Sequence, residues 1–401
     1  MVESLRSRPG WQRVDDIMRQ GLGVTYPAAS LIVQQRNEIR FQATYGWVDP
    51  EKSRWPVQAD TLFDLASLTK LFTAVAFMTL VAAGAVALDT PVSEVVPEFD
   101  GVHPIRPGID PHTKTLLPAS KALTGQSVNA RQVTFRHLLT HTSGLAAWDN
   151  FCMHQDGPVP MPHQVPAPTR RARLESFLAS PRFVAPPGDR FLYSDLGFIL
   201  LGEAIERLTN GSLPDYLARA VFAPLDMPTM TYNPIARGLP RQRIAPTEFC
   251  AWRKRRVWGE VHDENAACLG GVAGHAGLFG TAREIARLGQ CFLHEGAPLL
   301  PPQLARTMVQ NHIRTGEARR GLGWQLQSHH SPVGPAFGPR SFGHTGFTGV
   351  SLWIDPDRDL LVALLTNRVY FGRDGEAIAR FRRHLHEAVI HAIDDISEKT
   401  S

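Results

Sequence analysis

The residue types that could carry out covalent chemistry come together at Ser67-Leu68-Thr69-Lys70, within DLASLTKLFTAV. Serine is a weak nucleophile until a neighbouring group removes its proton. Residues three positions apart lie on one face of a helix, so Ser67 and Lys70 would be neighbours. Burial would lower the pKa of Lys70 and let its amine act as a base or proton shuttle. If Ser67 opens the apolar helix that follows, its backbone N–H would also stabilise an oxyanion.

Two further motifs follow the serine motif along the chain. Tyr193-Ser194-Asp195 precedes an apolar helix, and a phenol near a lysine can serve as a general base. His344-Thr345-Gly346 opens a predicted strand, where the glycine would let a substrate backbone lie against the strand edge. An isolated S-x-x-K match usually marks only a helix start with a solvated lysine. The order and spacing of all three motifs favour one shared site.

Strand patterns at both ends of the chain must position these motifs. From about residue 70 to 315 the apolar spacing is mostly helical, broken by loops rich in Pro and Gly. We predict an α/β fold of the α+β type, in which both chain ends form one antiparallel sheet, with terminal helices flanking it and a large helical insertion. The predicted strands are 29–35, 39–45, 321–327, 349–354 and 360–366, and the predicted terminal helices are 11–20 and 378–396.

This architecture divides the chain into two lobes. Residues 1–66 and 320–401 would form the sheet lobe, and residues 67–319 would form a mainly helical lobe. Each lobe would carry part of the motif set, because the first two motifs fall in the helical lobe and the third falls in the sheet lobe. We therefore expect the active site at the interface between the lobes.

Composition excludes several classes of protein. The 401 residues include 42 Lys and Arg against 38 Asp and Glu, a balance too even to favour a nucleic-acid partner. Hydrophobic residues make up 43% of the chain, which is typical of a globular protein. The four cysteines form no C-x-x-C pair, so we expect neither a zinc ribbon nor a disulfide framework. Their spacing is compatible with a reducing compartment.

Two segments bear on localisation. The N-terminal residues contain no apolar run of signal-peptide length, so we expect a cytoplasmic protein, or an exported one whose leader has been removed. Residues 71–88 carry no charge and just reach the length of a membrane span. This segment is rich in Ala and directly follows Lys70, which favours a helix in the protein interior and predicts no transmembrane segment.

Together, the three motifs resemble those of the serine β-lactamase and penicillin-binding protein superfamily. The chain is most similar to the branch with a tyrosine in the second motif, which contains the larger serine β-lactamases, D-Ala-D-Ala carboxypeptidases and related esterases. Residues 133–145 (VTFRHLLTHTSGL) and 270–281 (GGVAGHAGLFGT) also resemble this branch. The resemblance covers nearly the whole chain and implies a β-lactamase/transpeptidase-like fold with covalent acyl-enzyme chemistry.

The resemblance also implies a role for each motif residue. Ser67 would be the acylated nucleophile, while Lys70 and Tyr193 would remove its proton and pass it to the leaving group. The backbone N–H groups of Ser67 and Phe347 would form the oxyanion hole. The partner would be a small-molecule or peptide substrate, and no metal or organic cofactor is implied. The residues expected to contact the substrate are Asp195, His344, Thr345 and Gly346.

Two departures from the family pattern leave the substrate open. Asp195 stands where the lactamases usually have asparagine, and a carboxylate can only accept hydrogen bonds, which weakens the case for efficient β-lactam hydrolysis. His344 replaces a lysine, so we expect a weaker positive charge that depends on pH near neutrality. We expect a serine acyl hydrolase acting on a β-lactam, a D-Ala-D-Ala peptide or a small ester. The alternative is a non-catalytic penicillin-binding or sensor protein on the same fold.

Two groups of histidines raise the question of metal binding. His262, Asp263 and His275 could hold a divalent ion, and a metal-dependent hydrolase is a third possibility. A polar loop that bonds backbone groups near the active site is the favoured interpretation, since acyl-serine chemistry needs no metal. His137 and His141 lie four apart, but HLLTH lacks the glutamate of a zinc helix, so we expect helix capping there.

Overall fold

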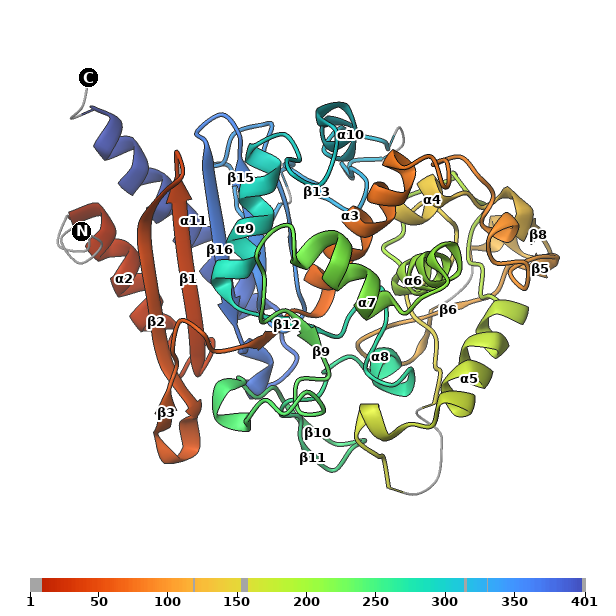
Figure 1. Ribbon diagram of the computed structural model, residues 1–401, viewed down its shortest axis with the longest axis horizontal. Coiled ribbons are helices and arrows are strands. Elements are labelled where there is room, and N and C mark those ends of the chain that lie inside the picture. The colour runs from red at the N-terminus through yellow and green to blue at the C-terminus, as the bar shows by residue number, and fades with distance from the viewer. Residues whose placement is uncertain (1–8, 118–119, 153–157, 314–315, 330, 399–401) are drawn as a thin grey trace.

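The computed structural model describes residues 9–117, 120–152, 158–313, 316–329 and 331–398. A seven-stranded antiparallel sheet forms one side of the molecule (Figure 1), with the strand order β13-β14-β15-β16-β1-β2-β3. In the centre of the sheet β1 pairs with β16, so the two chain ends share one sheet, as the sequence predicts. The strands are β1 (Ala28–Gln35), β2 (Glu38–Asp49), β3 (Arg54–Pro56), β13 (Gln325–Leu326), β14 (Phe342–Thr345), β15 (Ser351–Asp355) and β16 (Leu360–Thr366).

Helices cover both faces of this sheet. α2 (Pro9–Gly21) and α11 (Glu376–Glu398) lie on one face, and α9 (Ala282–Leu293) lies on the other (Figure 1). Every residue of β1, β15 and β16 is buried, because both of their faces are covered. α9 packs with the sheet although it falls within residues 67–319, and the division into two lobes at those boundaries stays a prediction.

The remaining helices form the second half of the molecule. All residues of α3 from Thr69 to Met78 are buried, so the uncharged segment after Lys70 forms a core helix, as predicted. Within the described residues, no helix has both the length and the hydropathy that crossing a bilayer requires. These helices are α3 (Thr69–Ala82), α4 (Phe135–Leu139), α5 (Ala167–Ala179), α6 (Asp195–Thr209), α7 (Leu213–Leu217), α8 (Glu264–Cys268) and α10 (Pro302–Met308).

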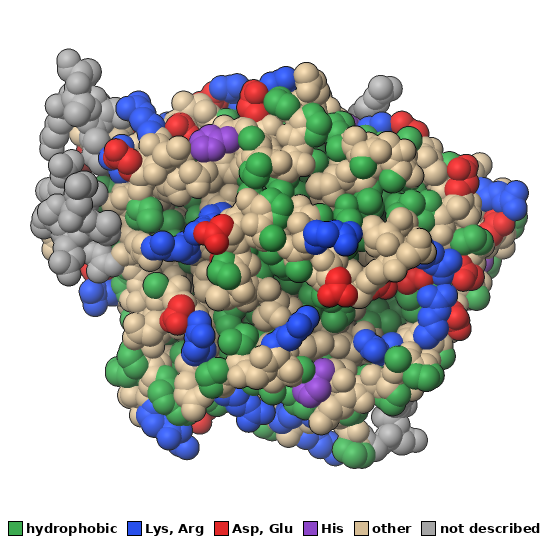
Figure 2. All heavy atoms as spheres, in the orientation of Figure 1, with side chains coloured by type: hydrophobic (Ala, Val, Ile, Leu, Met, Phe, Trp, Pro, Cys, Tyr) green, Lys and Arg blue, Asp and Glu red, His purple; other side chains and the backbone are tan. Residues whose placement is uncertain are grey.

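Short strands complete the helical half. The strands β4, β12 and β9 form a small sheet. Its strand β4 directly precedes the nucleophile segment in the chain and pairs with β12 (residues 278–280). On the face that Figure 2 shows, basic and acidic side chains are interspersed, as the near-balance of charges leads one to expect. The short strands are β4 (Phe63–Asp64), β5 (Val102–Pro104), β6 (Gly108–Ile109), β7 (Leu116–Leu117), β8 (Ser127–Asn129), β9 (Thr231–Tyr232), β10 (Phe249–Cys250), β11 (Arg255–Arg256) and β12 (Leu278–Gly280).

A glycine contact fixes the loop after α8 against α6. A Cβ placed on Gly274 would lie 2.2 Å from the carbonyl oxygen of Phe198 and 3.0 Å from the backbone nitrogen of Gly202. The carbonyl of Gly274 accepts a hydrogen bond of 2.7 Å from Thr73 in α3. The absence of a side chain at Gly274 therefore lets this loop contact two helices at once.

We predict that Gly274→Ala destabilises the protein by about 1–3 kcal/mol, because the added methyl group has to push α6 and the loop apart. The free energy of unfolding, measured with urea, checks this. The control is Gly211→Ala, where the nearest heavy atom to an added Cβ lies at 3.8 Å and the expected change is within about 0.5 kcal/mol. Equal stability of the two variants would contradict the prediction.

Candidate active site

The nucleophile segment forms a strained turn directly before α3. Ser67 lies in a 3₁₀ turn (Ala66–Leu68), two residues before the first residue of the helix, and Ala66 has a φ of 44°. Positive φ is unfavourable for a residue with a side chain, so neighbouring groups have to hold the turn. The carboxylate of Asp64 accepts the N–H of Ala66 at 2.8 Å, and Thr348 donates to the carbonyl of Asp64 at 2.7 Å. The serine is therefore presented by a turn that contacts both halves of the molecule.

Lys70 lies in the first turn of α3 and is completely buried. Its Nζ donates to Ser67 Oγ at 2.9 Å and to the carbonyl of His275 at 3.1 Å. It also lies 2.7 Å from Oδ1 of Asp195, the first residue of α6. An ammonium group has three protons to donate, and these three acceptors account for all of them. The predicted proximity of Ser67 and Lys70 is confirmed.

The protonation state of Lys70 differs from the expectation. Burial lowers its pKa, but the negative charge of Asp195 and the interactions with Tyr193 raise it by more, so that the pKa lies above its ordinary value. The expectation of a lowered pKa was therefore wrong, because it considered burial without the ion pair. At neutral pH Lys70 is an ammonium that donates to Ser67 and favours its alkoxide.

Tyr193 lies beside this ammonium, with its ring centre 5.0 Å from Lys70 Nζ. His141 holds the tyrosine loop on both sides. The carbonyl of His141 accepts the N–H of Leu192 at 2.8 Å, and its Nδ1 accepts the N–H of Ser194 at 3.0 Å. The His141 ring also packs on Tyr193, with 4.4 Å between ring centres. The structure thus brings together all three predicted catalytic side chains.

His141 is a positioning residue that the sequence interpretation missed. The expected capping role belongs to His137, whose Nδ1 accepts the N–H of Thr134 at the start of α4. His141 lies beyond α4, with a φ of 57°, and burial holds its pKa well below the usual range. The neutral ring can therefore accept from Ser194. The similarity of HTSGL to a family segment was the available signal, but it assigned no role to this residue.

The third motif lies on β14 and meets the nucleophile turn through Gly346. A Cβ on Gly346 would lie 2.6 Å from the carbonyl oxygen of Leu65 and 3.3 Å from Cβ of Ala66. The glycine therefore accommodates the protein's own turn, where the sequence interpretation expected a substrate backbone. Phe347 and Ser67 line the same cavity, and the oxyanion role of their two N–H groups stays a prediction.

His344 carries no positive charge at neutral pH. Its side chain is buried, and Nδ1–H donates to the carbonyl of Thr345 at 2.7 Å. Burial, together with the positive charges of Arg320 and Lys70, holds the pKa of His344 well below its usual range. The expectation of a partial charge that depends on pH near neutrality was therefore wrong. Any fixed positive charge at this end of the site has to come from other residues.

Arginines supply that charge. Ser67, Tyr193 and the third motif open on a cavity of about 620 Å³, and none of the residues that line it is an Asp or a Glu. Arg368, Arg373 and Arg382 lie near the C-terminus and Arg320 lies before β13, and no sequence motif marked any of the four. The cavity is lined by Ser67, His112, Tyr193, Arg320, Gln325, His344, Thr345, Gly346, Phe347, Arg368, Arg373, Gly375, Ile378 and Arg382.

The predicted metal cluster separates into two groups. His262 lies 3.3 Å from a carboxylate oxygen of Glu248, away from the other predicted ligands. His275 bonds to Asp263 at 2.7 Å, and these two residues lie within 4.8 Å of an Asp195 oxygen. By distance these three residues could hold a metal, but Asp195 is already paired with the Lys70 ammonium. The loop supports Lys70 through the carbonyl of His275, as the favoured interpretation of a polar loop predicts.

Asp263 begins α8 and anchors this loop. Its carboxylate accepts the N–H of Ala266 at 2.7 Å and contacts His275. Burial raises the pKa of Asp263, but the interactions with His275 and Lys70 outweigh it and hold the pKa well below the usual range. Asp195 pairs with the Lys70 ammonium, and Asp263 bonds to His275 in the loop that supports it. The expected contact of Asp195 with substrate stays a prediction.

A disulfide joins the end of α8 to the loop that contains Cys152. Cys152 and Cys268 are bonded, with a Cα–Cα distance of 5.9 Å, and Cys250 and Cys291 are free and buried. The number of cysteines argued against a framework of several disulfides, and this one bond is compatible with that expectation. It fixes α8 at the end opposite Asp263.

Comparison with known proteins places this site in a family. Residues 14–387 match the family model described as Beta-lactamase, and the chain therefore belongs to the beta-lactamase family of serine hydrolases. A protein of Salmonella agona (strain SL483) named "Putative D-alanyl-D-alanine carboxypeptidase" is 29% identical over 89% of this chain and 82% of its own length. A protein of Salmonella typhi with the same name is 28% identical over the same shares.

Solved structures share the fold. Simvastatin synthase (LovD) from Aspergillus terreus superposes with a TM-score of 0.70 at 20% identity, over 96% of this chain and 98% of that chain. EstCE1, described as a hydrolase with promiscuous acyltransferase activity, gives a TM-score of 0.68 at 21% identity, over 94% of this chain and 98% of that chain. At these identities the similarity establishes the fold alone, and it confirms the β-lactamase-like fold that the motifs predict.

We predict that Asp195→Asn lowers the pKa of Lys70, because burial then acts without the opposing carboxylate charge. Loss of the ammonium at high pH would remove the proton donated to Ser67. The alkaline limb of the pH profile for Ser67 acylation should therefore move to lower pH by about 1–3 pH units. The control is Asp60→Asn, which removes an exposed carboxylate paired with Arg243. Coincident alkaline limbs for wild type and Asp195→Asn would contradict the prediction.

Proposed function

We propose that this protein is a serine acyl hydrolase that forms a covalent acyl-enzyme at Ser67 with an amide or ester substrate. The candidate substrates are a D-Ala-D-Ala peptide end, a β-lactam and a small ester. The observation that carries the proposal is the hydrogen bond of 2.9 Å between the buried Lys70 ammonium and Ser67 Oγ. A solvated lysine on an ordinary helix would give no such contact, and the family membership supports the same reaction class.

In the proposed acylation step, Tyr193 accepts the proton of Ser67 while the serine oxygen forms a bond to the substrate carbonyl carbon. To accept this proton Tyr193 has to act as a phenolate, and the Lys70 ammonium stabilises the negative charge first on the tyrosine oxygen and then on the attacking serine oxygen. The N–H groups of Ser67 and Phe347 would bind the carbonyl oxygen of the tetrahedral intermediate. When the intermediate collapses, the bond to the leaving group breaks and the leaving group takes the proton from Tyr193.

In the deacylation step, water attacks the ester at Ser67 and loses a proton to Tyr193. The tetrahedral intermediate then releases the carboxylic acid, and Ser67 regains its proton. The same three side chains therefore serve both half-reactions, and no external oxidant, reductant or metal enters the balance. The relative rates of the two steps would decide whether the enzyme turns over a β-lactam or retains it.

The disulfide supports the exported alternative for localisation. Disulfides persist mainly in oxidising compartments. The bonded pair joins Cys152 to Cys268, far apart in sequence, and Cys268 ends the helix that Asp263 begins. We therefore propose that the protein works outside the reducing cytoplasm, where peptides of the cell wall are also found.

We predict that a fluorescent penicillin or a reactive ester adds the mass of one acyl group to the wild-type protein, and that Ser67→Ala abolishes this adduct. The reason is that the Ser67 hydroxyl lines the cavity and accepts a hydrogen bond from the Lys70 ammonium. Intact-protein mass, followed over time, measures both formation and loss of the adduct.

The matched control for that experiment is Ser180→Ala, which removes an exposed serine hydroxyl outside the cavity. It should be acylated like the wild type. An adduct that persists unchanged on Ser67→Ala would overturn the nucleophile assignment. Ligand-induced thermal stabilisation without an adduct or product would favour the non-catalytic sensor instead.

We predict two reactive thiols per unfolded chain before reduction and four after it, because Cys152 and Cys268 are bonded while Cys250 and Cys291 are free. A chromogenic thiol assay in denaturant gives this count on protein purified from an oxidising compartment. Cys152→Ser should leave three thiols in the unreduced protein. Four thiols in the unreduced wild type would argue against the bond.

A further inference from the structure

Two of the four arginines at the cavity are buried without an acidic partner. Arg368 and Arg382 are only 7% and 6% exposed. Arg382 donates to the carbonyl of Val350 at 2.7 Å, and Arg368 donates to the carbonyl of Asp374 at 2.7 Å. Among the residues that the structure describes, neither guanidinium forms an ion pair with a carboxylate. Nε of Arg382 is buried and has no hydrogen-bond partner there.

Burial of the charged guanidinium groups of Arg368 and Arg382 is energetically unfavourable. Burial lowers the pKa of Arg382 to about 9, with a further contribution from the charge of Arg368. Burial likewise lowers the pKa of Arg368 to about 10. Both groups are still charged at neutral pH, and a buried charge without a partner opposes folding. An anion bound in the cavity would relieve that cost.

Arg320 forms a second positive group, on the tyrosine side of the cavity. Its guanidinium carbon lies 4.8 Å from the ring centre of Phe191 and 5.7 Å from that of Tyr193. Its Nη1 is buried without a hydrogen-bond partner among the described residues. Arg368, by contrast, lies over the ring of Phe347 at 4.6 Å. The two positive groups therefore lie against different aromatic side chains of the same cavity.

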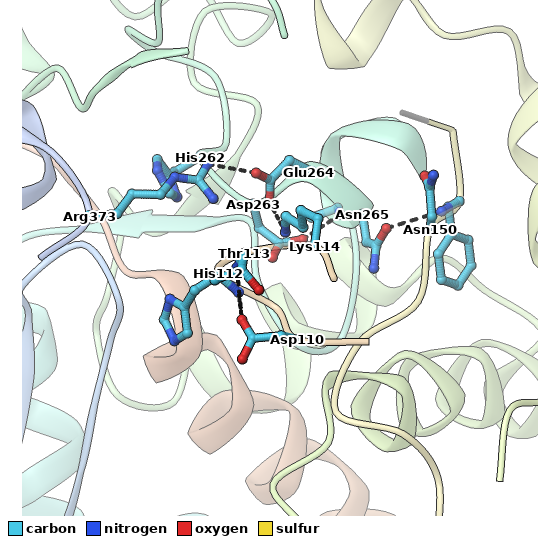
Figure 3. Close-up of polar contacts among 12 residues, drawn as sticks. Asp110, His112, Thr113, Lys114, Asn150, His262, Asp263, Glu264, Asn265 and Arg373 are labelled. Carbon is cyan, nitrogen blue, oxygen red and sulfur yellow. Dashed lines mark hydrogen bonds and ion pairs between the residues drawn. The ribbon is translucent and has the colours of Figure 1, made fainter. Parts of the chain in front are cut away.

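Arg373, the fourth arginine of the cavity, has two acidic partners that neutralise its charge. Its guanidinium bonds to Glu248 at 2.6 Å and to Glu264 at 2.6 Å. Figure 3 shows Arg373 reaching toward Glu264, which Lys114 also approaches at 3.5 Å. These carboxylates neutralise Arg373 and fix it as part of the wall. Among the described residues, Arg320, Arg368 and Arg382 form no such ion pair, although the charges of Asp374 and Glu248 offset part of the effect of burial on the pKa of Arg368.

We infer that the substrate carries two carboxylates, one of which pairs with Arg320 and the other with Arg368 and Arg382. This inference rests on the proposed function, because it names the substrate class for the same serine. The substrate class is an acyl compound with one carboxylate in the acyl part and one in the leaving group. A guanidinium binds a carboxylate through two parallel hydrogen bonds, which suits three arginines whose donors are not used by acids.

Four matched thioesters test the inference. The acyl group is butanoyl or glutaryl, which adds a carboxylate to the same three-carbon chain, and the leaving thiol is mercaptopropionamide or mercaptopropionate, which have nearly the same shape. A thiol-reactive chromophore reports kcat/KM. Each negative charge should raise kcat/KM of the wild type at least about tenfold, in keeping with hydrogen bonds to charged groups.

Two variants separate the positive groups. Arg320→Met should abolish the preference for a negative charge in only one part of the substrate, either the acyl group or the leaving thiol. Arg368→Met should abolish this preference only in the other part. Arg306→Met, which removes an exposed arginine paired with Glu295, should keep both preferences. Charge ratios within twofold of unity in the wild type, or the same half affected by both variants, would overturn the inference.

Binding to the Ser67→Ala protein distinguishes this inference from the proposed function. Calorimetry should show that glutarate binds at least about tenfold more tightly than butanoate, and that Arg320→Met and Arg368→Met in the Ser67→Ala background each weaken glutarate binding. If no thioester is hydrolysed but glutarate shows this pattern, the proposed reaction fails and the two-carboxylate site stands. If thioesters are hydrolysed through Ser67 without charge preference and glutarate binds no better than butanoate, only the two-carboxylate site fails.

Discussion

The buried ammonium of Lys70 is the interaction on which the rest of the site depends. Its three acceptors come from the nucleophile turn, from the start of α6 and from the loop after α8. A lysine buried without these acceptors would carry an uncompensated charge, which is strongly unfavourable. Folding of the helical half therefore requires these three segments to pack around Lys70. The same packing places Ser67, Lys70 and Tyr193 close enough for proton transfer.

Much of the fold could be predicted because its signals are local. The strand at residues 360–366 and the terminal helices follow from periodicity, and strands at both ends of the chain have to pair to share a core. The predicted strand at 321–327 was too long, since only Gln325 and Leu326 pair with β14. The apolar pattern marks residues that can adopt an extended conformation, whereas the length of the neighbouring strand decides how many of them form hydrogen-bonded pairs.

The electrostatics could not be predicted in the same way. A motif specifies which residues approach the nucleophile, but a pKa depends on every charge around the group. Asp195 reverses the effect of burial on the pKa of Lys70, while the charges of Arg320 and Lys70 add to the effect of burial on the pKa of His344. The positive charge that a lysine would place at the third motif is instead carried by arginines that no motif marks.

The two halves of the molecule contribute different parts of the proposed chemistry. Lys70 and Tyr193 lie in the helical half, and Ser67 lies in a turn that is held from the sheet half by Thr348. The backbone of Phe347 belongs to the sheet half and reaches the serine only because Gly346 lets β14 approach the carbonyl of Leu65. A displacement between the halves would therefore change both the oxyanion geometry and the support of the turn that carries Ser67. The close backbone contact at Gly346 is therefore required to bring the nucleophile turn and the backbone of Phe347 into one site.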